Sequence, residues 1–126
     1  MKKEIKAKWL KALRSGRYKQ CEGYLHTGKG YCCLGILAKV QGAKFIQIGD
    51  GDGDIPFFPK YKGKVFDGSS SYLDKELAAG LRTNSQMKLS KLNDGLRKYD
   101  DDSGTVEFVE PPLSFKEIAD YIEKHY

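Results

Sequence analysis

The amino-acid sequence predicts an α+β fold, in which residues 1–126 form a single domain with three to four helices and a few short antiparallel strands. Apolar residues recur at helical spacing near both ends of the chain, whereas short apolar runs between glycines and prolines fill the middle. Strands and helices do not alternate regularly in this pattern, which argues against a doubly wound sheet. The length also suits one hydrophobic core.

The two terminal helices have the clearest sequence patterns. The first is expected over residues 3–14, and Gly16 follows it at a position where glycine commonly ends a helix. The last is expected to start at Ser114, because Ser114 and Glu117 form a capping box. Both segments carry apolar residues three and four positions apart, namely Ile5, Trp9, Leu10 and Leu13 in the first, and Phe115, Ile118, Ala119 and Ile122 in the last.

Further helices are expected between these two. Apolar residues from Leu34 predict one that ends near Gly42, and periodicity leaves open whether Cys32 pairs in a strand or starts this helix. Another is expected to start near Tyr72, with its apolar face running to Leu81. Residues 87–92 predict one more short element.

A tight hairpin is expected before the second helix. Segments 23–26 and 31–34 flank the turn residues Thr27-Gly28-Lys29-Gly30, a pattern that favours two short paired strands. Further strand candidates are the segments 45–48, 64–66 and 106–109.

Two segments are expected to lack regular structure. Pro56 and Pro59 bracket a pair of phenylalanines, so this stretch is predicted to be irregular but anchored by its aromatic side chains. The stretch near 98–105 contains three consecutive aspartates and is predicted to be a flexible acidic loop.

Charge is unevenly distributed along the chain, whose formal net charge is +5. Residues 1–19 hold eight basic side chains and one acidic one, whereas residues 94–126 hold four basic and nine acidic ones. The basic N-terminal helix could therefore contact nucleic acid or an acidic partner. The alternative is that it docks near the acidic C-terminal end of the same molecule.

The cysteines and the longest apolar runs indicate a cytoplasmic protein without membrane contact. Three cysteines, two of them adjacent, suit reduced thiols better than a disulfide framework. No apolar run approaches the roughly 20 residues that a membrane span needs. The basic N-terminus is not followed by the apolar core of a signal peptide.

A phosphate-loop motif is almost complete. Residues 23–30 follow the pattern G-x-x-x-x-G-K-[ST] up to its last letter, where Gly30 lacks the hydroxyl that would bind magnesium. No apolar strand precedes Gly23, so a nucleotide triphosphatase is not favoured. A glycine turn can still cradle an anion with its backbone N–H groups, and basic side chains are near in sequence.

Alternating aspartates suggest a calcium-binding loop, but two other positions of the loop motif do not match. Asp50, Asp52 and Asp54 fill three of its positions, but Ile55 and Tyr61 stand where glycine and glutamate are required. Glycine and aspartate are common turn residues, so a solvated acidic turn explains the segment. No metal site and no cofactor is predicted.

A cysteine at the start of a helix can be an activated nucleophile, because the helix dipole stabilises its thiolate. Cys33 has this placement, and His26 lies across the expected hairpin as a candidate base. The other interpretation, which we favour, makes Cys32 and Cys33 small buried hydrophobes. Zinc is disfavoured, because adjacent cysteines lack the spacing that places two sulfurs on one ion.

An aromatic and basic surface is expected around the hairpin. Tyrosines interleave with arginines and lysines here, and aromatic rings that stack bases beside cations that bind phosphates are typical of nucleotide or single-strand sites. The alternative is that the tyrosines only pack, with their hydroxyls at the surface. The candidate ligand-binding residues are Arg14, Arg17, Tyr18, Lys19, Tyr24, His26, Gly28, Lys29, Gly30 and Tyr31.

Three motifs resemble a group of small bacteriophage and prophage proteins. They are Trp9-x₃-Leu13-Arg14-Ser15-Gly16-x-Tyr18-x-Gln20, then Gly30-Tyr31-Cys32-Cys33-Leu34-Gly35-Ile36-Leu37, and Ser114-Phe115-x₂-Ile118-Ala119-Asp120-x-Ile122-Glu123. Leu92-Asn93-Asp94 is similar as well, and residues 95–113 then separate pieces that are often only a few residues apart in the group. The resemblance implies a viral origin, and hence the cytoplasm of a host cell, without implying a particular chemistry.

We therefore expect a small phage accessory protein that acts by binding. The leading hypothesis is that it counters host defence, either by sequestering a nucleotide signal or by capping a host defence protein. An alternative from another class is a cysteine-dependent hydrolase or transferase that uses Cys33 and His26. A second alternative is nucleic-acid binding through the basic N-terminal helix.

Overall fold

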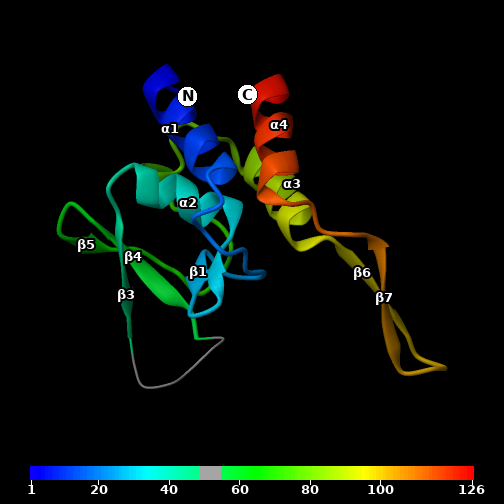
Figure 1. The fold of residues 1–126 in the computed structure, drawn as a ribbon. Coiled ribbons are helices and arrows are strands. Elements are labelled where there is room, and N and C mark those ends of the chain that lie inside the picture. The colour runs from blue at the N-terminus through cyan, green and yellow to red at the C-terminus, as the bar shows by residue number, and fades with distance from the viewer. Residues whose placement is uncertain (49–54) are drawn as a thin grey trace.

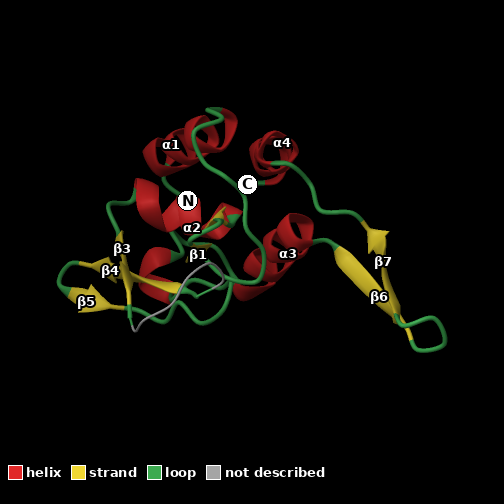
Figure 2. Ribbon diagram, turned by 60° about the horizontal axis from the view of Figure 1, so that its bottom comes forward, coloured by secondary structure: helices red, strands yellow, loops and turns green. Residues whose placement is uncertain are grey.

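The computed structural model describes residues 1–48 and 55–126. Within them, four α-helices form the body of the molecule and short antiparallel strands flank it, which confirms the α+β fold class (Figure 1, Figure 2). The helices are α1 (Lys3–Arg14), α2 (Cys33–Val40), α3 (Thr83–Asp94) and α4 (Phe115–His125). The excluded calcium motif, Asp50, Asp52 and Asp54, lies outside the described residues.

The four helices enclose the core. α1 packs against α2 and α4, and α3 packs against the same two helices. Trp9 of α1 is fully buried, and its Nε1 donates a hydrogen bond to the carbonyl oxygen of Cys33 at 2.8 Å. The large aliphatic side chains of the core are Leu13, Leu25, Leu34, Ile36, Leu37, Leu77, Leu89, Ile118 and Ile122. The apolar residues whose spacing predicted the terminal helices thus face a shared core.

The described strands form three separate antiparallel sheets. In chain order they are β1 (His26–Thr27), β2 (Gly30–Tyr31), β3 (Lys44–Gln47), β4 (Phe57–Tyr61), β5 (Lys64–Val65), β6 (Leu96–Asp100) and β7 (Thr105–Glu110). β1 pairs with β2 in a hairpin at the predicted place, but Thr27 and Gly30 belong to its strands and not to its turn, and the expected second strand ends at Tyr31 because Cys33 begins α2. β4 lies between β3 and β5 in a three-stranded sheet. β6 and β7 pair in a second hairpin, which joins α3 to α4 and projects away from the helices (Figure 1, Figure 2).

Helix boundaries follow the sequence signals at three places. Gly16 follows α1 with a φ of 74°, a left-handed conformation that favours glycine. The capping box at α4 is formed, because the Ser114 hydroxyl accepts from the Glu117 N–H at 3.3 Å and the Glu117 carboxylate accepts from the Ser114 N–H at 3.1 Å. Cys32 is extended and caps α2, so the chain turns from strand to helix at this residue.

The helix expected from Tyr72 to Leu81 does not form. Only a short 3-10 helix, Lys75–Leu77, occurs there. The reason is tertiary, because the side-chain amide of Gln86 accepts from the Leu73 N–H at 2.7 Å and donates to the Leu73 carbonyl at 3.2 Å. Ala79, with a φ of 53°, then ends the turn.

The stretch with two prolines is a strand and not irregular. β4 pairs with β3 through Phe57, Phe58 and Pro59, and the Pro59 carbonyl accepts a hydrogen bond from the Phe66 N–H at 2.8 Å. The strand therefore tolerates a proline that accepts a ladder hydrogen bond through its carbonyl but has no N–H to donate.

The acidic stretch near 98–105 is not an open loop either. Its first residues belong to β6 and Thr105 begins β7, so only residues 101–104 form the turn between the strands. Tyr99 pairs with Val106, and the Arg97 guanidinium lies 5.1 Å from the ring centre of Phe108. These cross-strand contacts of aromatic and apolar side chains favour a strand despite the neighbouring charges.

Candidate functional site

A buried polar junction holds the Cys32-Cys33 pair in place. Asn93 at the end of α3 is fully buried, and its Oδ1 accepts hydrogen bonds from the Cys33 N–H and from Gln20 Nε2, both at 3.1 Å. Its Nδ2 donates to the Cys21 carbonyl at 2.8 Å. One amide thus satisfies backbone groups on two segments and ties the start of α2 to the end of α3. We call these five residues, with Cys32 included, the junction.

Two glycines beside the junction are required by close backbone contacts. A Cβ atom at Gly35 would lie 1.9 Å from the Leu25 carbonyl oxygen, and one at Gly30 would lie 2.2 Å from the Lys19 carbonyl oxygen. No side chain fits at either distance. Packing therefore explains these two glycines of the motif that resembles phage proteins.

The thiols of the junction are not activated. Burial raises the pKa of Cys32 to about 12 and the pKa of Cys33 well above its ordinary value. The Cys32 sulfur accepts a hydrogen bond from the Gly35 N–H, and the Cys33 thiol donates to the Leu89 carbonyl at 3.7 Å. Both thiols are protonated near neutral pH, which supports their interpretation as buried hydrophobes.

The His26 ring contacts Gly30 and Tyr31 and not the cysteines. Its Nδ1 lies 2.6 Å from the Gly30 carbonyl oxygen, and its ring stacks on Tyr31 with centres 3.7 Å apart. Burial lowers the pKa of His26, so the neutral ring is favoured. The geometry therefore gives Cys33 no histidine base of the kind that a cysteine hydrolase needs.

An aromatic cluster surrounds His26. Phe57 and Phe45 meet the imidazole edge to face, at 4.6 Å and 5.1 Å between ring centres, and Tyr18 meets Tyr31 in the same way at 5.4 Å. The cluster, made of Tyr18, His26, Tyr31, Phe45 and Phe57, joins the first hairpin to the three-stranded sheet. Its rings are half-buried and pack with one another, as the packing interpretation of the tyrosines expects.

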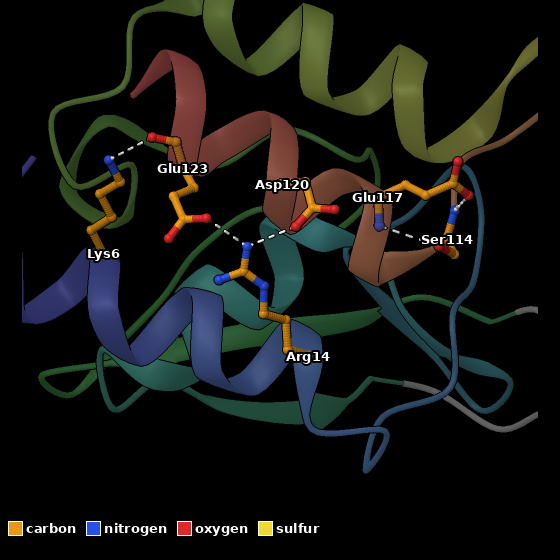
Figure 3. Close-up of polar contacts among 6 residues, drawn as sticks. All are labelled: Lys6, Arg14, Ser114, Glu117, Asp120 and Glu123. Carbon is orange, nitrogen blue, oxygen red and sulfur yellow. Dashed lines mark hydrogen bonds and ion pairs between the residues drawn. The ribbon is translucent and has the colours of Figure 1, made fainter.

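Arg14 is taken up by the pairing of the first and last helices. Its guanidinium binds Asp120 at 2.8 Å and Glu123 at 2.9 Å, and the Lys6 ammonium donates to the Glu123 carbonyl (Figure 3). The basic N-terminal helix thus docks against the acidic C-terminal helix through these two cations. Arg14 is correspondingly not placed for binding a ligand.

A basic concavity lies beside this helix pair. It has a volume of about 450 Å³ and is formed by the second half of α1, the chain that follows it and the end of α2. Its lining residues are Lys8, Lys11, Ala12, Ser15, Arg17, Tyr18 and Val40. Three of these are cations and none is a carboxylate, so the concavity is suited to an anion. We call it the basic concavity.

A second concavity is electrostatically mixed. It has a volume of about 570 Å³, and Tyr24 and Lys29 line it together with Glu22 and Arg97. Arg97 and Glu22 form an ion pair with each other, which neutralises much of the local charge. The backbone N–H of Lys29 donates to the Thr27 hydroxyl at 3.1 Å and is not directed at a ligand, so the anion cradle expected at the glycine turn is weakened.

The candidate ligand-binding residues therefore do not form one site. Arg17 and Tyr18 line the basic concavity, whereas Tyr24 and Lys29 line the mixed one. The others have structural roles or surface positions. They are Arg14 in the helix pair, His26 and Tyr31 in the aromatic cluster, Lys19 and Gly30 at the close backbone contact, and Gly28 exposed in the turn.

Sequence reasoning missed two cations of the basic concavity. Lys8 and Lys11 are three residues apart in α1, and Ser15 follows four residues later, so all three lie along one side of the helix. This face differs from the one that buries Trp9 and Leu13. The signal was present in the helical spacing, although only the fold places it beside Arg17.

Comparison with known proteins gives a match to part of the chain. A domain of unknown function, DUF8296, matches residues 1–47, the segment from the N-terminus through β3. All lining residues of the basic concavity fall within it. No curated protein and no solved structure matches the chain. Among the described residues, no helix has the length and apolar character that crossing a membrane requires.

Proposed function

We propose that this protein binds and sequesters a small phosphorylated ligand of the nucleotide class in the basic concavity. The observation that carries the proposal is the lining itself, in which Lys8, Lys11 and Arg17 occur together with Tyr18 and without any carboxylate. Its volume of about 450 Å³ lies in the range of about 300–1,000 Å³ that is common for small-molecule sites.

Each part of the lining has a role in this proposal. The Arg17 guanidinium is planar and can bind a phosphate with two hydrogen bonds, while Lys8 and Lys11 add positive charge. Tyr18 is half-buried and supported by Tyr31, so its ring is available at a fixed place for stacking on a base. Phosphate charge and a flat ring are the two features that a nucleotide offers.

We propose binding without catalysis, because the cysteine thiols are not placed to act as nucleophiles. Cys33 is fully buried and protonated, so the alternative of a cysteine-dependent hydrolase or transferase has no support from its surroundings. For a protein that resembles phage proteins, sequestration of a nucleotide would withdraw a signal from host defence. No chemical change of the ligand is needed for that effect.

Isothermal titration calorimetry with a panel of cyclic and ADP-ribose-type nucleotides tests the proposal. At least one member should bind the wild-type protein, and Arg17→Glu should weaken it by about tenfold or more, because a charge-assisted contact becomes a repulsive one. Lys116→Glu, an exposed change of the same charge on α4, is the matched control and should bind normally. Absence of heat across the panel, or equal binding by Arg17→Glu, would remove the proposal.

A short single-stranded oligonucleotide should be included, because nucleic acid presents the same phosphates and bases. A nucleic-acid mode predicts tighter binding to the oligonucleotide than to any nucleotide, with affinity that falls steeply as salt rises. A strong preference for the oligonucleotide would replace the nucleotide proposal by the nucleic-acid alternative.

A further inference from the structure

The projecting hairpin of β6 and β7 has one apolar face. The register pairs Tyr99 with Val106 and Arg97 with Phe108, so these four side chains lie on the same side of the ribbon. Tyr99, Val106 and Phe108 are 61%, 57% and 49% exposed. The opposite side carries Lys98 paired with Glu107. These exposed apolar side chains belong to an arm that extends beyond the helices (Figure 1, Figure 2).

In the part of the chain that the structure describes, the hairpin leaves backbone groups unpaired along the outer edge of β6. A two-stranded ribbon alone is only marginally stable, and of the described residues none pairs with the outer edge of β6. Such an edge offers unpaired backbone N–H and C=O groups to another strand. An apolar face next to an open edge is typical of a surface that binds a partner.

The charges along β6 identify a partner that fits. Arg97 and Lys98 precede Tyr99 in this strand and Asp100 ends it, so the charge changes from positive to negative about Tyr99. If a second β6 lies antiparallel with Tyr99 opposite Tyr99, Lys98 faces Asp100 of the partner subunit. Opposite charges in directly opposed positions stabilise a sheet.

The other outer edge does not have this complementarity. The charged residues of β7 are Glu107 and Glu110, so two antiparallel copies of β7 have no opposite charges to pair. Pairing of β6 with the partner's β7 is a heterologous contact that leaves further edges to be paired in each dimer, whereas β6 with β6 closes after two copies about a two-fold axis.

We propose that this chain forms a symmetric dimer in which the two β6 strands pair antiparallel about Tyr99. The result is a four-stranded sheet in the order β7, β6, β6, β7, with the apolar side chains of both hairpins on one face. The Lys98–Asp100 pair is the informative one, because Arg97 already binds Glu22 of its own chain. The dimer is independent of the proposed ligand, since no residue of the hairpin lines the basic concavity.

Sedimentation over a concentration series, combined with charge reversal, tests this dimer. The wild-type protein should dimerise, and Lys98→Asp or Asp100→Lys should each weaken dimerisation by about tenfold or more, because both copies of the cross-strand pair become repulsive. Mixing the two single variants should restore association as a heterodimer, since each carboxylate of one variant then faces an ammonium group of the other. Lys116→Asp is the matched control and should dimerise like the wild type.

Cross-linking provides a second readout that does not depend on the charges. Opposed residues of antiparallel strands have Cα atoms about 4.5–5.5 Å apart, which suits a disulfide, so Tyr99→Cys should form a covalent dimer on oxidation. Val106→Cys lies on the same face but three strand spacings from its copy, about 14 Å, and should not cross-link.

Three results would overturn the dimer. They are a wild-type protein that stays monomeric throughout the series, a dimer that is unaffected by both charge reversals, and equal cross-linking of the two cysteine variants. Capture of a different protein by a monomeric wild type would assign the hairpin to that partner and likewise overturn self-pairing.

Discussion

The end of α3 leads into two regions that are built in opposite ways. Asn93 belongs to the junction, where one buried amide bonds to backbone groups on two segments and the packing leaves no space for a Cβ at Gly35. Leu96, three residues later, begins a hairpin in which every residue of both strands is exposed. Cys32, Cys33 and Asn93 of the junction are shielded from solvent, whereas the hairpin presents apolar side chains and an open edge.

The contrast shows that motif density is a poor guide to which apolar side chains are exposed in this molecule. Glycines and adjacent cysteines draw attention to the junction, but close packing and hydrogen bonding account for them. The hairpin has no motif, and the charged sequence of β6 resembles a solvated loop, although β7 contains the strand predicted at 106–109. Its apolar face becomes visible only when the register places Tyr99, Val106 and Phe108 on one side.

Gly35→Ala should have the largest effect on the junction. Alanine stabilises an exposed helix by about 1 kcal/mol relative to glycine, so helix propensity alone predicts a gain. The clash with the Leu25 carbonyl predicts the opposite, a loss of about 3 kcal/mol or more in the free energy of unfolding. Urea denaturation measures it. Gly23→Ala, where no atom is near but φ is positive, should lose only about 1–2 kcal/mol.

Asn93→Leu should have the next largest effect. The substitution keeps the volume similar but leaves the Cys33 N–H and the Cys21 carbonyl without partners, at a cost of about 2–4 kcal/mol in the free energy of unfolding. Asn84→Leu on the exposed side of α3 is the control and should change stability by less than about 0.5 kcal/mol. Similar losses in the two variants would mean that the amide does not hold the junction.

Phe108→Ser should have the smallest effect on the fold. The side chain lies on the hairpin outside the core, so the free energy of unfolding should change by less than about 0.5 kcal/mol when it is measured at protein concentrations low enough to keep the chain monomeric. Phe115→Ser is the same substitution in the core and should cost about 3–5 kcal/mol. Equal losses would show that the hairpin belongs to the folded body.

The terminal helices could be predicted because their signals are local. A capping box at Ser114 and a glycine after α1 specify boundaries through contacts within a few residues. The helix expected after Tyr72 fails for a non-local reason, since Gln86 of α3 takes both backbone groups of Leu73. β6 was not predicted, because it forms a strand through its pairing with β7 and its own composition does not favour one.

The candidate site was only partly predictable for the same reason. Arg17 and Tyr18 could be chosen from the mixture of aromatic and basic residues around the first hairpin. Lys8 and Lys11 join them only because α1 packs against α2 and brings Val40 to the same concavity. Arg14 has the same chemistry as Arg17 but does not line the basic concavity. Its guanidinium instead binds two carboxylates of α4 that lie more than a hundred positions away in the sequence.

Alkylation of the cysteines is the measurement that tests most directly whether the junction is structural. Burial raises the pKa of Cys21 to about 11 and that of Cys32 to about 12, and the pKa of Cys33 is raised as well, so the folded protein holds almost no thiolate near neutral pH. Iodoacetamide followed by mass spectrometry should label neither Cys32 nor Cys33 in the folded protein, and should label both after unfolding in urea. Rapid labelling of Cys33 in the folded protein near neutral pH would contradict a structural junction and favour an activated nucleophile.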